Sequence, residues 1–290
     1  MAALGPGLWV KLATKMPCWK VEAYEDFDRF LGEQLERLQT DHIDFYLLHS
    51  LNGRTWPKVR DLDVLGWAEG ALADGRIRHL GFSFHDKYEV FEEIVDATDL
   101  WTFCQIQYNF MDIDEQAGTK GLKYAAGKGL AVVVMEPIRG GRLSGTVPPS
   151  VQALWDEAPV ERTPAEWALQ WVWNQRSGVG TLNDEELALF ARVKETYEAL
   201  CPIPCTKCDY CQPCPQGVKI PRVFEIYNEL MMYGDEGRAQ MFYSWLADDE
   251  RADLCIDCGE CLDKCPQMIE IPDWLATAHD VLCQEEASAA

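Results

Sequence analysis

The sequence lacks the features that would assign it to a membrane or to the cell exterior. Its longest apolar runs, such as Leu130–Met135, are far shorter than the ~20 residues that a membrane-spanning helix needs. The first ten residues carry no basic segment, Gly5-Pro6-Gly7 interrupts any apolar one, and no small-residue cleavage site follows. We therefore expect no signal peptide, no membrane span and a cytoplasmic location.

Basic residues are scarce. The 290 residues include 26 Lys and Arg against 48 Asp and Glu, a net charge of −22. A surface of that sign repels the phosphates of nucleic acids and of anionic lipids, so we expect neither as a partner. Two interpretations of the acidity stay open: an ordinary soluble surface, or a field that steers a basic redox partner. Hydrophobic residues make up 48% of the chain, enough for a packed core.

Cysteine is nearly absent from the first 200 residues, which hold two of the twelve. We expect those two, Cys18 and Cys104, to be ordinary packing residues. Eight of the other ten form two closely spaced runs. Without a secretion signal, thiols two residues apart favour a metal site over disulfides. The runs are Cys205, Cys208, Cys211 and Cys214, and then Cys255, Cys258, Cys261 and Cys265, each followed by proline.

The spacing favours two [4Fe–4S] clusters. The second run has the bacterial ferredoxin spacing, in which three cysteines hold one cluster and the fourth ligates the other. By that logic Cys265 joins Cys205, Cys208 and Cys211, while Cys214 joins Cys255, Cys258 and Cys261. The first run is one residue shorter before its fourth cysteine, so this exchange is less firmly indicated than cluster binding. Two four-cysteine zinc sites are the alternative, although zinc usually pairs two C-x2-C motifs across a longer gap.

The first 140 residues alternate between strand-like and helix-like segments. Such repeats predict a parallel α/β fold, either a (β/α) barrel or a doubly wound open sheet. No G-x-G-x-x-G follows any strand, which weighs against the open sheet. The apolar run of the last strand predicts burial on both faces. The expected strands are Val10–Lys15, Ile43–His49, Ile77–Phe84, Phe103–Tyr108 and Leu130–Met135; the expected helices are Glu25–Leu38, Leu65–Asp74, Tyr88–Ala97 and Leu122–Lys128.

The rest of the chain is predicted to be helical. Thr163 with Glu166, and Asn183 with Glu186, are capping boxes that start two helices. Pro202 and Pro204 end the second one. Between the cysteine runs, apolar residues recur at helical spacing over 221–250, and this long helical spacer predicts an all-helical dicluster ferredoxin-like domain.

Polar residues at the carboxyl ends of the expected strands lie where barrel active sites are built. Together with several longer strings, they resemble aldo/keto reductases that carry a C-terminal ferredoxin-type domain. The strings include Leu12-Ala-Thr-Lys15, Ile43-Asp-Phe-Tyr-Leu-Leu-His49, Gly81-Phe-Ser-Phe-His-Asp86, Gln105-Ile-Gln-Tyr-Asn109 and Met135-Glu-Pro137.

The resemblance implies a TIM barrel that reduces a carbonyl with NADPH through an Asp–Tyr–Lys–His tetrad. It maps the Lys to Lys15 and the His to His49, and it places Ser83 and Gln105 where the family holds the nicotinamide amide. In the family the Lys lowers the pKa of the Tyr so that the phenol can protonate the carbonyl oxygen. Each of the four residues also suits a purely structural role at a strand end.

The sequence departs from this family in three places. None of the fourteen residues before Lys15 is Asp or Tyr, so we expect the first two strands and half of the tetrad to be missing. The chain passes almost directly from Gln175 to Asn183, where the family has its last strand and its phosphate-binding turn. Met135 stands where many reductases stack an aromatic ring on the nicotinamide.

Five strands cannot close an eight-stranded barrel, so we expect an incomplete (β/α)8 TIM-type barrel with exposed edges at its first and fifth strands. The expected domains are a partial barrel over 1–182, a connecting helix over 183–200 and a 4Fe–4S ferredoxin-type domain over 201–290. A truncated reading frame, a variant that closes its barrel with a partner and a degenerate scaffold would each explain the missing strands.

Three functions stay open. The first is an iron–sulfur oxidoreductase that couples NAD(P)H and carbonyl chemistry to two clusters, with a small-molecule redox substrate or a protein electron carrier as partner. The second is an electron-transfer module on a degenerate barrel without carbonyl reductase activity. The third is a zinc-stabilised interaction protein, which would be colourless where iron–sulfur proteins are brown.

Overall fold

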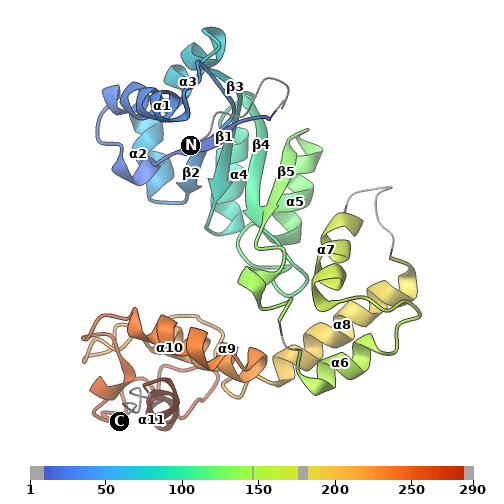
Figure 1. Cartoon of the computed structure of the whole chain (residues 1–290). Helices are drawn as coiled ribbons and strands as arrows, with labels where there is room; N and C mark the ends of the chain where they lie inside the picture. Colours follow the sequence, from blue (N-terminus) through green and yellow to red (C-terminus); the bar gives the residue numbers. More distant parts are fainter. Residues whose placement is uncertain (1–9, 146, 176–181, 284–290) are drawn as a thin grey trace, which may run out of the picture. The chain divides into compact units, whose positions relative to one another are not determined.

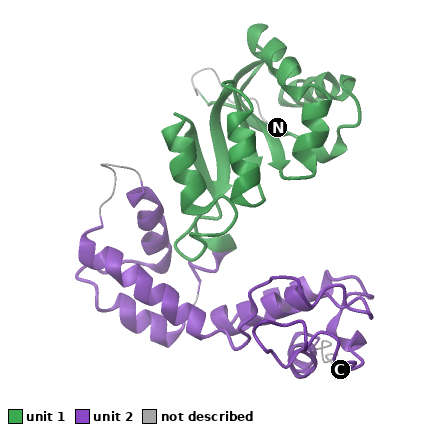
Figure 2. Cartoon of the chain, turned by 180° about the vertical axis from the view of Figure 1, so that it is seen from behind, with its two compact units in different colours: residues 1–140 green, residues 141–290 purple. Residues whose placement is uncertain are grey.

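The computed structural model describes residues 10–145, 147–175 and 182–283. The chain divides into two compact units, residues 1–140 and 141–290, which Figure 2 shows in different colours. Each unit is described by itself. No helix in these described ranges is both long enough and apolar enough to cross a membrane.

The first unit is built on a parallel sheet with the strand order β1-β2-β3-β4-β5 (Figure 1). Because every strand pairs with its neighbour in sequence, the order lacks the reversal that defines a doubly wound sheet. Right-handed crossovers then place the connecting helices on one face, as in a barrel. The incomplete barrel expected from the sequence is therefore confirmed. The strands are β1 (Ala13–Met16), β2 (Ile43–Leu51), β3 (Ile77–Phe84), β4 (Trp101–Gln107) and β5 (Ala131–Met135).

Five α-helices and the short η1 (Cys18–Lys20) connect these strands. Their apolar faces pack on the sheet and bury large side chains such as Phe27, Trp67 and Phe91. Cys18 and Cys104 are fully buried in this layer, which confirms them as packing residues. The helices are α1 (Glu25–Leu38), α2 (Thr55–Asp61), α3 (Val64–Ala73), α4 (Tyr88–Asp96) and α5 (Gly118–Gly127).

The other face of the sheet is concave. The rings of Phe45 on β2 and Phe103 on β4 meet edge to face at 5.5 Å, although β3 runs between their strands. Gly81 of β3 makes this possible, because a Cβ there would lie 2.6 Å from the Phe103 ring. The ring of Phe103 thus occupies the space that a side chain on β3 would take, and the sheet curls around it.

The prediction that the fifth strand is buried on both faces was wrong. β5 lies at one edge of the sheet, and Val133 in its middle is 45% exposed. The apolar run reflects β propensity and one packed side, not two covered faces. The prediction that the first and fifth strands are the sheet edges is confirmed.

The second unit is helical in its described residues. The short η2 (Arg139–Gly141) spans the boundary in sequence, and α6 (Pro149–Trp155), α7 (Pro164–Asn174) and α8 (Asp184–Ala199) follow in the second unit. Both predicted capping boxes are present, at Thr163 and Asn183. Trp155 and Trp167 stack at 4.8 Å and hold α6 against α7. The shortened segment expected before Asn183 falls largely on residues 176–181, which lie outside the described residues.

The cysteine runs lie within a small bundle of α9 (Ile220–Tyr233), α10 (Glu236–Ser244) and α11 (Ile271–Leu282), with η3 (Ala252–Leu254) before the second run (Figure 1). Fully buried side chains such as Ile220, Phe224 and Leu275 form its core, and the cysteine loops pack against that core. The predicted all-helical cluster domain is confirmed in the described residues. The sequence analysis did not anticipate α11.

Candidate functional site

The two cysteine runs fold into tight loops with unusual backbone conformations. Lys207, Asp209 and Asp257 stand between ligand-spaced cysteines and have φ values of 54°, 62° and 52°. Non-glycine residues rarely adopt this left-handed conformation. In such loops successive backbone N–H groups turn to the same side and create a concavity that suits an anionic group such as a thiolate-ligated cluster.

The cysteines group around two cavities. One is lined by Cys205, Cys208, Cys211 and Cys265. The other is lined by Cys214, Cys255, Cys258 and Cys261, and Cys211 also reaches its wall. Cys265 and Cys214 therefore each stand in the cavity of the other run, which is the exchanged grouping that the ferredoxin spacing suggested.

The donor chemistry of these cavities fits iron–sulfur clusters. Both are apolar pockets walled by thiols, the soft ligands that iron–sulfur clusters require. Burial, followed by the charge of Cys205, raises the pKa of Cys211 to about 11. The thiol is thus held neutral without a metal, and bound iron would be needed to stabilise the thiolate. Among the described residues, no three His, Cys, Asp or Glu side chains converge tightly enough to hold a single metal ion.

A second polar site lies at the carboxyl ends of the strands in the first unit. Lys15 Nζ on β1 donates a 2.5 Å hydrogen bond to Gln105 Oε1 on β4. The two strands are three steps apart in the sheet, roughly 14 Å along its surface at the usual strand spacing. Only the curl of the sheet brings these side chains together.

His49 extends this site from the end of β2. Its ring lies 4.9 Å from the ring of Trp19. Burial and the nearby cationic groups Lys15 and His85 lower its pKa. Burial also lowers the pKa of Lys15. His49 is thus neutral near pH 7, close to a lysine whose charge is poorly solvated.

Ser83 lies near this site but is committed to another contact. Its hydroxyl is fully buried and accepts a 2.8 Å hydrogen bond from the backbone N–H of Ser50. Ser50 has a φ of 57°, a strained conformation that this bond helps to hold. In the described structure, Ser83 therefore ties the end of β2 to β3.

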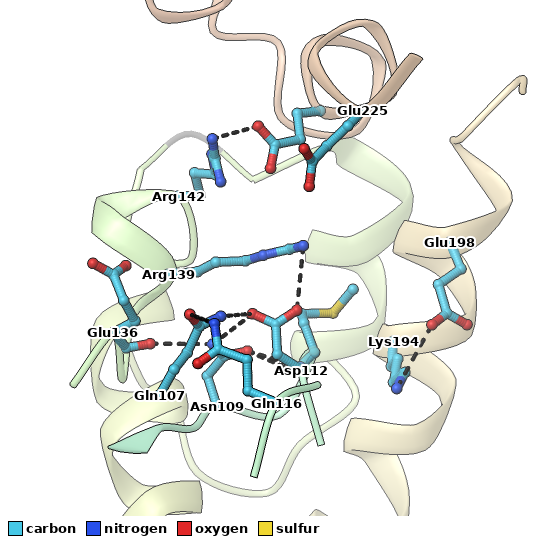
Figure 3. A network of polar contacts seen from close by, with 12 residues as sticks. Gln107, Asn109, Asp112, Gln116, Glu136, Arg139, Arg142, Lys194, Glu198 and Glu225 are labelled. Carbon is cyan, nitrogen blue, oxygen red and sulfur yellow. Dashed lines mark hydrogen bonds and ion pairs between the residues drawn. The ribbon is translucent and has the colours of Figure 1, made fainter. Parts of the chain in front are cut away.

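The sequence analysis missed two features of the site. His85 follows Ser83 closely, and its pKa is lowered by burial and by Lys15. A string of polar residues at the ends of β4 and β5 surrounds the buried carboxylate of Asp112, which accepts hydrogen bonds from Gln107 and Asn109 and pairs with Arg139 (Figure 3). His85 directly follows the predicted strand Ile77–Phe84, and this position was the sequence signal that could have identified it as a site residue.

Taken together, a curled parallel sheet with polar residues at its carboxyl ends, followed by a helical module with two cysteine-lined cavities, defines a barrel-type protein joined to an iron–sulfur domain. Residues 9–188 match the model of the aldo/keto reductase family, and residues 204–269 match the model of a 4Fe-4S dicluster domain. The chain belongs to the aldo/keto reductase family and carries a 4Fe-4S domain.

Individual relatives are more distant. An uncharacterized oxidoreductase, YrpG, of Bacillus subtilis (strain 168) is 28% identical over 120 residues, which are 40% of this chain and 35% of that protein. Glyoxal reductase of the same organism is 28% identical over 124 residues, 42% of this chain and 41% of that protein. The chain thus spans about two fifths or less of these curated relatives.

Among solved structures, an aldo-keto reductase, AKR11C1, from Bacillus halodurans in its holo form is similar. The match has a TM-score of 0.51 and 21% identity, and it covers 63% of this chain and 72% of that one. At this identity the likeness supports the barrel-type fold alone.

Proposed function

We propose that this chain is an iron–sulfur oxidoreductase that couples NAD(P)H and carbonyl redox chemistry to two [4Fe–4S] clusters. The observation that carries the proposal is the Lys15–Gln105 contact beside His49, in the same chain as a 4Fe-4S dicluster domain. When bound, NAD(P)H would supply two electrons: a carbonyl would take both as a hydride, or two clusters would take one electron each with the release of one proton.

In this proposal the cysteines divide by cavity. Cys205, Cys208, Cys211 and Cys265 hold one cluster, and Cys214, Cys255, Cys258 and Cys261 hold the other. Cys211, which reaches both cavities, lies between the two and shortens the path for an electron that passes from one to the other.

The barrel residues take up the carbonyl and the nicotinamide. His49, neutral near pH 7, hydrogen-bonds the carbonyl oxygen, and the positive charge of Lys15 stabilises the negative charge that develops there. Gln105 holds Lys15 in place through its Oε1 and offers its amide N–H to the nicotinamide amide, whereas the Ser83 hydroxyl, which already accepts from Ser50, has only its O–H to donate. The proton that completes the alcohol must come from another group, because no Asp or Tyr precedes Lys15 in this sequence.

A second function is favoured by a specific observation. Ser83, one of the two residues assigned to the nicotinamide amide, accepts a hydrogen bond from Ser50, and Met135 replaces the stacking ring. In this alternative the chain is an electron-transfer module on a degenerate barrel. The two functions differ in whether the barrel binds a nicotinamide at all.

Nicotinamide binding tests the proposal. We expect the cluster-loaded protein to blue-shift NADPH fluorescence, and Lys15→Met to weaken the affinity about tenfold, because Gln105 loses the hydrogen bond that orients its amide. Lys123→Met, an exposed lysine on α5, is the matched control and should bind like the parent protein. Absence of saturable binding in the parent protein would establish the electron-transfer alternative instead.

A further inference from the structure

His85 occupies a position from which it can reach the carbonyl site. It directly follows Phe84, the last residue of β3, and its backbone N–H donates a 3.1 Å hydrogen bond to the carbonyl oxygen of Leu51 at the end of β2. Side chains alternate between the two faces of a strand, so His85 lies on the same face of β3 as Gly81. That face is the concave one, because the ring of Phe103 lies over Gly81.

His85 shares this end of the sheet with Lys15 and His49. The charge of Lys15 lowers the pKa of His85, and His85 in turn lowers the pKa of His49, so the three groups lie within electrostatic reach of one another. They come from the ends of three neighbouring strands. A carbonyl oxygen held by His49 and Lys15 therefore has a second imidazole close by.

Gln116, in the loop before α5, is a neighbour of His85. Its Nε2 donates a 3.2 Å hydrogen bond to Oε1 of Gln107 at the end of β4, which fixes the orientation of the amide (Figure 3). Its own Oε1 is buried and receives no full hydrogen bond in the described structure, yet it lies close enough to the imidazole to raise the pKa of His85. A buried acceptor without a donor is unfavourable. Protonation of His85 supplies an N–H for it.

The two histidines of the site differ in what surrounds them. Burial is the largest effect on both pKa values, and the charge of Lys15 opposes protonation of both. At His85, Gln116 and the carboxylate of Glu136 act in the opposite direction and favour the charged imidazole. At His49, burial, Lys15 and His85 all oppose it. The surroundings thus stabilise an imidazolium at His85 and not at His49.

His85 also keeps contact with solvent. The residue is exposed in the described structure, while the protein packed around part of its ring lowers its pKa. The next residue, Asp86, does not compete for its proton, because its carboxylate accepts hydrogen bonds from the backbone N–H groups of Gly53 and Lys87. Water can therefore return a proton to His85 after each turnover, as a proton donor requires.

We propose that His85 donates the proton that completes the alcohol, the role that the resemblance gives to a tyrosine missing before Lys15. His85 can act in this way only if the proposed carbonyl chemistry is correct. As the carbonyl carbon gains a hydride from the nicotinamide, the C=O π bond breaks and its electron pair goes to the oxygen. The oxygen then takes the N–H proton of the His85 imidazolium, which becomes neutral. The carbonyl is reduced and the nicotinamide is oxidised, while His49 and Lys15 hold the oxygen.

The test compares His85→Gln with His79→Gln in the full chain with its clusters. The probe is 4-nitrobenzaldehyde, an activated aldehyde, with NADPH as reductant, and the alcohol is measured by chromatography. At about pH 6, His85→Gln should lower kcat/KM about 100-fold, the lower end of what a positioned general acid contributes. NADPH affinity should stay within about twofold. His79 lies about 20 Å away at the other end of β3, so His79→Gln should match the parent protein.

A pH profile separates a proton donor from a structural residue. In the parent protein kcat/KM should rise as the pH falls and level off below the pKa of His85, because only the protonated imidazole donates. The imidazole signal of His85, assigned by its absence from His85→Gln, should give the same pKa by NMR without any nicotinamide. Gln116→Leu removes the neighbouring acceptor and should lower the kinetic and the NMR values together.

Each contrary result points to a different failure. Full activity in His85→Gln would overturn the proposal. So would a pH limb that persists in His85→Gln and disappears in His49→Gln, since His49 would then be the donor. If His85→Gln does not fold, Gln116→Leu carries the test, and a kinetic limb that stays in place while the NMR value falls would reject His85. A parent protein that neither binds NADPH nor reduces the aldehyde fails the proposed function itself, whereas one that reduces it equally well without His85 rejects only the role of His85.

Discussion

Three nitrogen-bearing side chains shape the electrostatics of the barrel site. Lys15, His49 and His85 come from the ends of three successive strands, and all have pKa values that burial lowers first. The charge of Lys15 lowers the pKa of both histidines further. Crowding of this kind disfavours protonation of any one member, so the two imidazoles are neutral near pH 7 and can act as hydrogen-bond partners.

The crowding leads to a prediction about pH. Lys15→Met removes a positive neighbour and should raise the pKa of His49 toward its ordinary value, as measured from the imidazole proton signals by NMR. In the parent protein the folded state binds this proton less readily than the unfolded chain. The free energy of unfolding should therefore fall as pH drops below 6.5, where the unfolded histidine becomes protonated. An unchanged His49 pKa in Lys15→Met would show that the two groups do not interact.

The exchanged cysteine grouping can be tested residue by residue. Cys265→Ser should lose the same electron paramagnetic resonance signal as Cys205→Ser, and Cys214→Ser should lose the same one as Cys255→Ser, because each pair lines one cavity. Cys283→Ser, an exposed cysteine outside the two runs, is the control and should keep all of the iron. If Cys214→Ser and Cys205→Ser lost the same signal instead, each run would hold its own cluster.

At the scale of elements, the curl of the sheet is what assembles the barrel site. Phe103 lies across Gly81, and this packing brings β4 toward β2 on the concave side. The contact of Lys15 with Gln105 depends on the same curl, since both residues point into it from strands three steps apart. Glycine at position 81 is therefore part of the framework of the site.

Replacing this glycine should destabilise the fold. In Gly81→Ala the new methyl group would lie 2.6 Å from the Phe103 ring, so we expect a loss of about 1–3 kcal/mol in the free energy of unfolding, measured by chemical denaturation. Gly70→Ala is the matched control, because nothing lies within 4 Å of a Cβ at this position inside α3. It should raise stability by about 0.5–1 kcal/mol through helix propensity. Equal effects of the two changes would contradict the packing argument.

Most strands and the longer helices of the first unit could be predicted because their apolar periodicity is strong. α1 and β3 have the predicted bounds, and both capping boxes lie where their side chains indicated. α2 and α6 were missed because each is seven residues long and too short to show a periodic face. α11 was predictable from Ile271, Leu275, Ala278 and Leu282 at helical spacing, which the sequence analysis did not use.

The candidate site was predictable in its members but not in its geometry. The ends of strands can be located from sequence, which singled out Lys15 and His49, whereas Gln105 came from the resemblance to aldo/keto reductases. Which of them touch depends on the curl of the sheet, a tertiary property set by packing such as Phe103 on Gly81. The bond from Ser50 to Ser83 depends on the left-handed conformation of Ser50 near the end of β2, which no local sequence pattern predicts.

At the scale of the whole molecule, the central claim is that one chain links two-electron nicotinamide chemistry to one-electron clusters. The two domains match separate family models, at residues 9–188 and 204–269. The proposed coupling requires that electrons delivered at the barrel reach the clusters within the same protein. Neither NADPH binding without cluster reduction nor clusters that only dithionite reduces would demonstrate this coupling.

The most direct test is an anaerobic visible spectrum of the purified protein, recorded before and after NADPH is added and again after dithionite. We expect brown protein whose broad iron–sulfur absorbance bleaches with NADPH in the parent protein and in Lys123→Met, and which in Lys15→Met needs about ten times more NADPH for the same bleaching. Dithionite should bleach all three. Bleaching by dithionite alone in the parent protein would contradict the coupling and leave an electron-transfer module on a degenerate barrel.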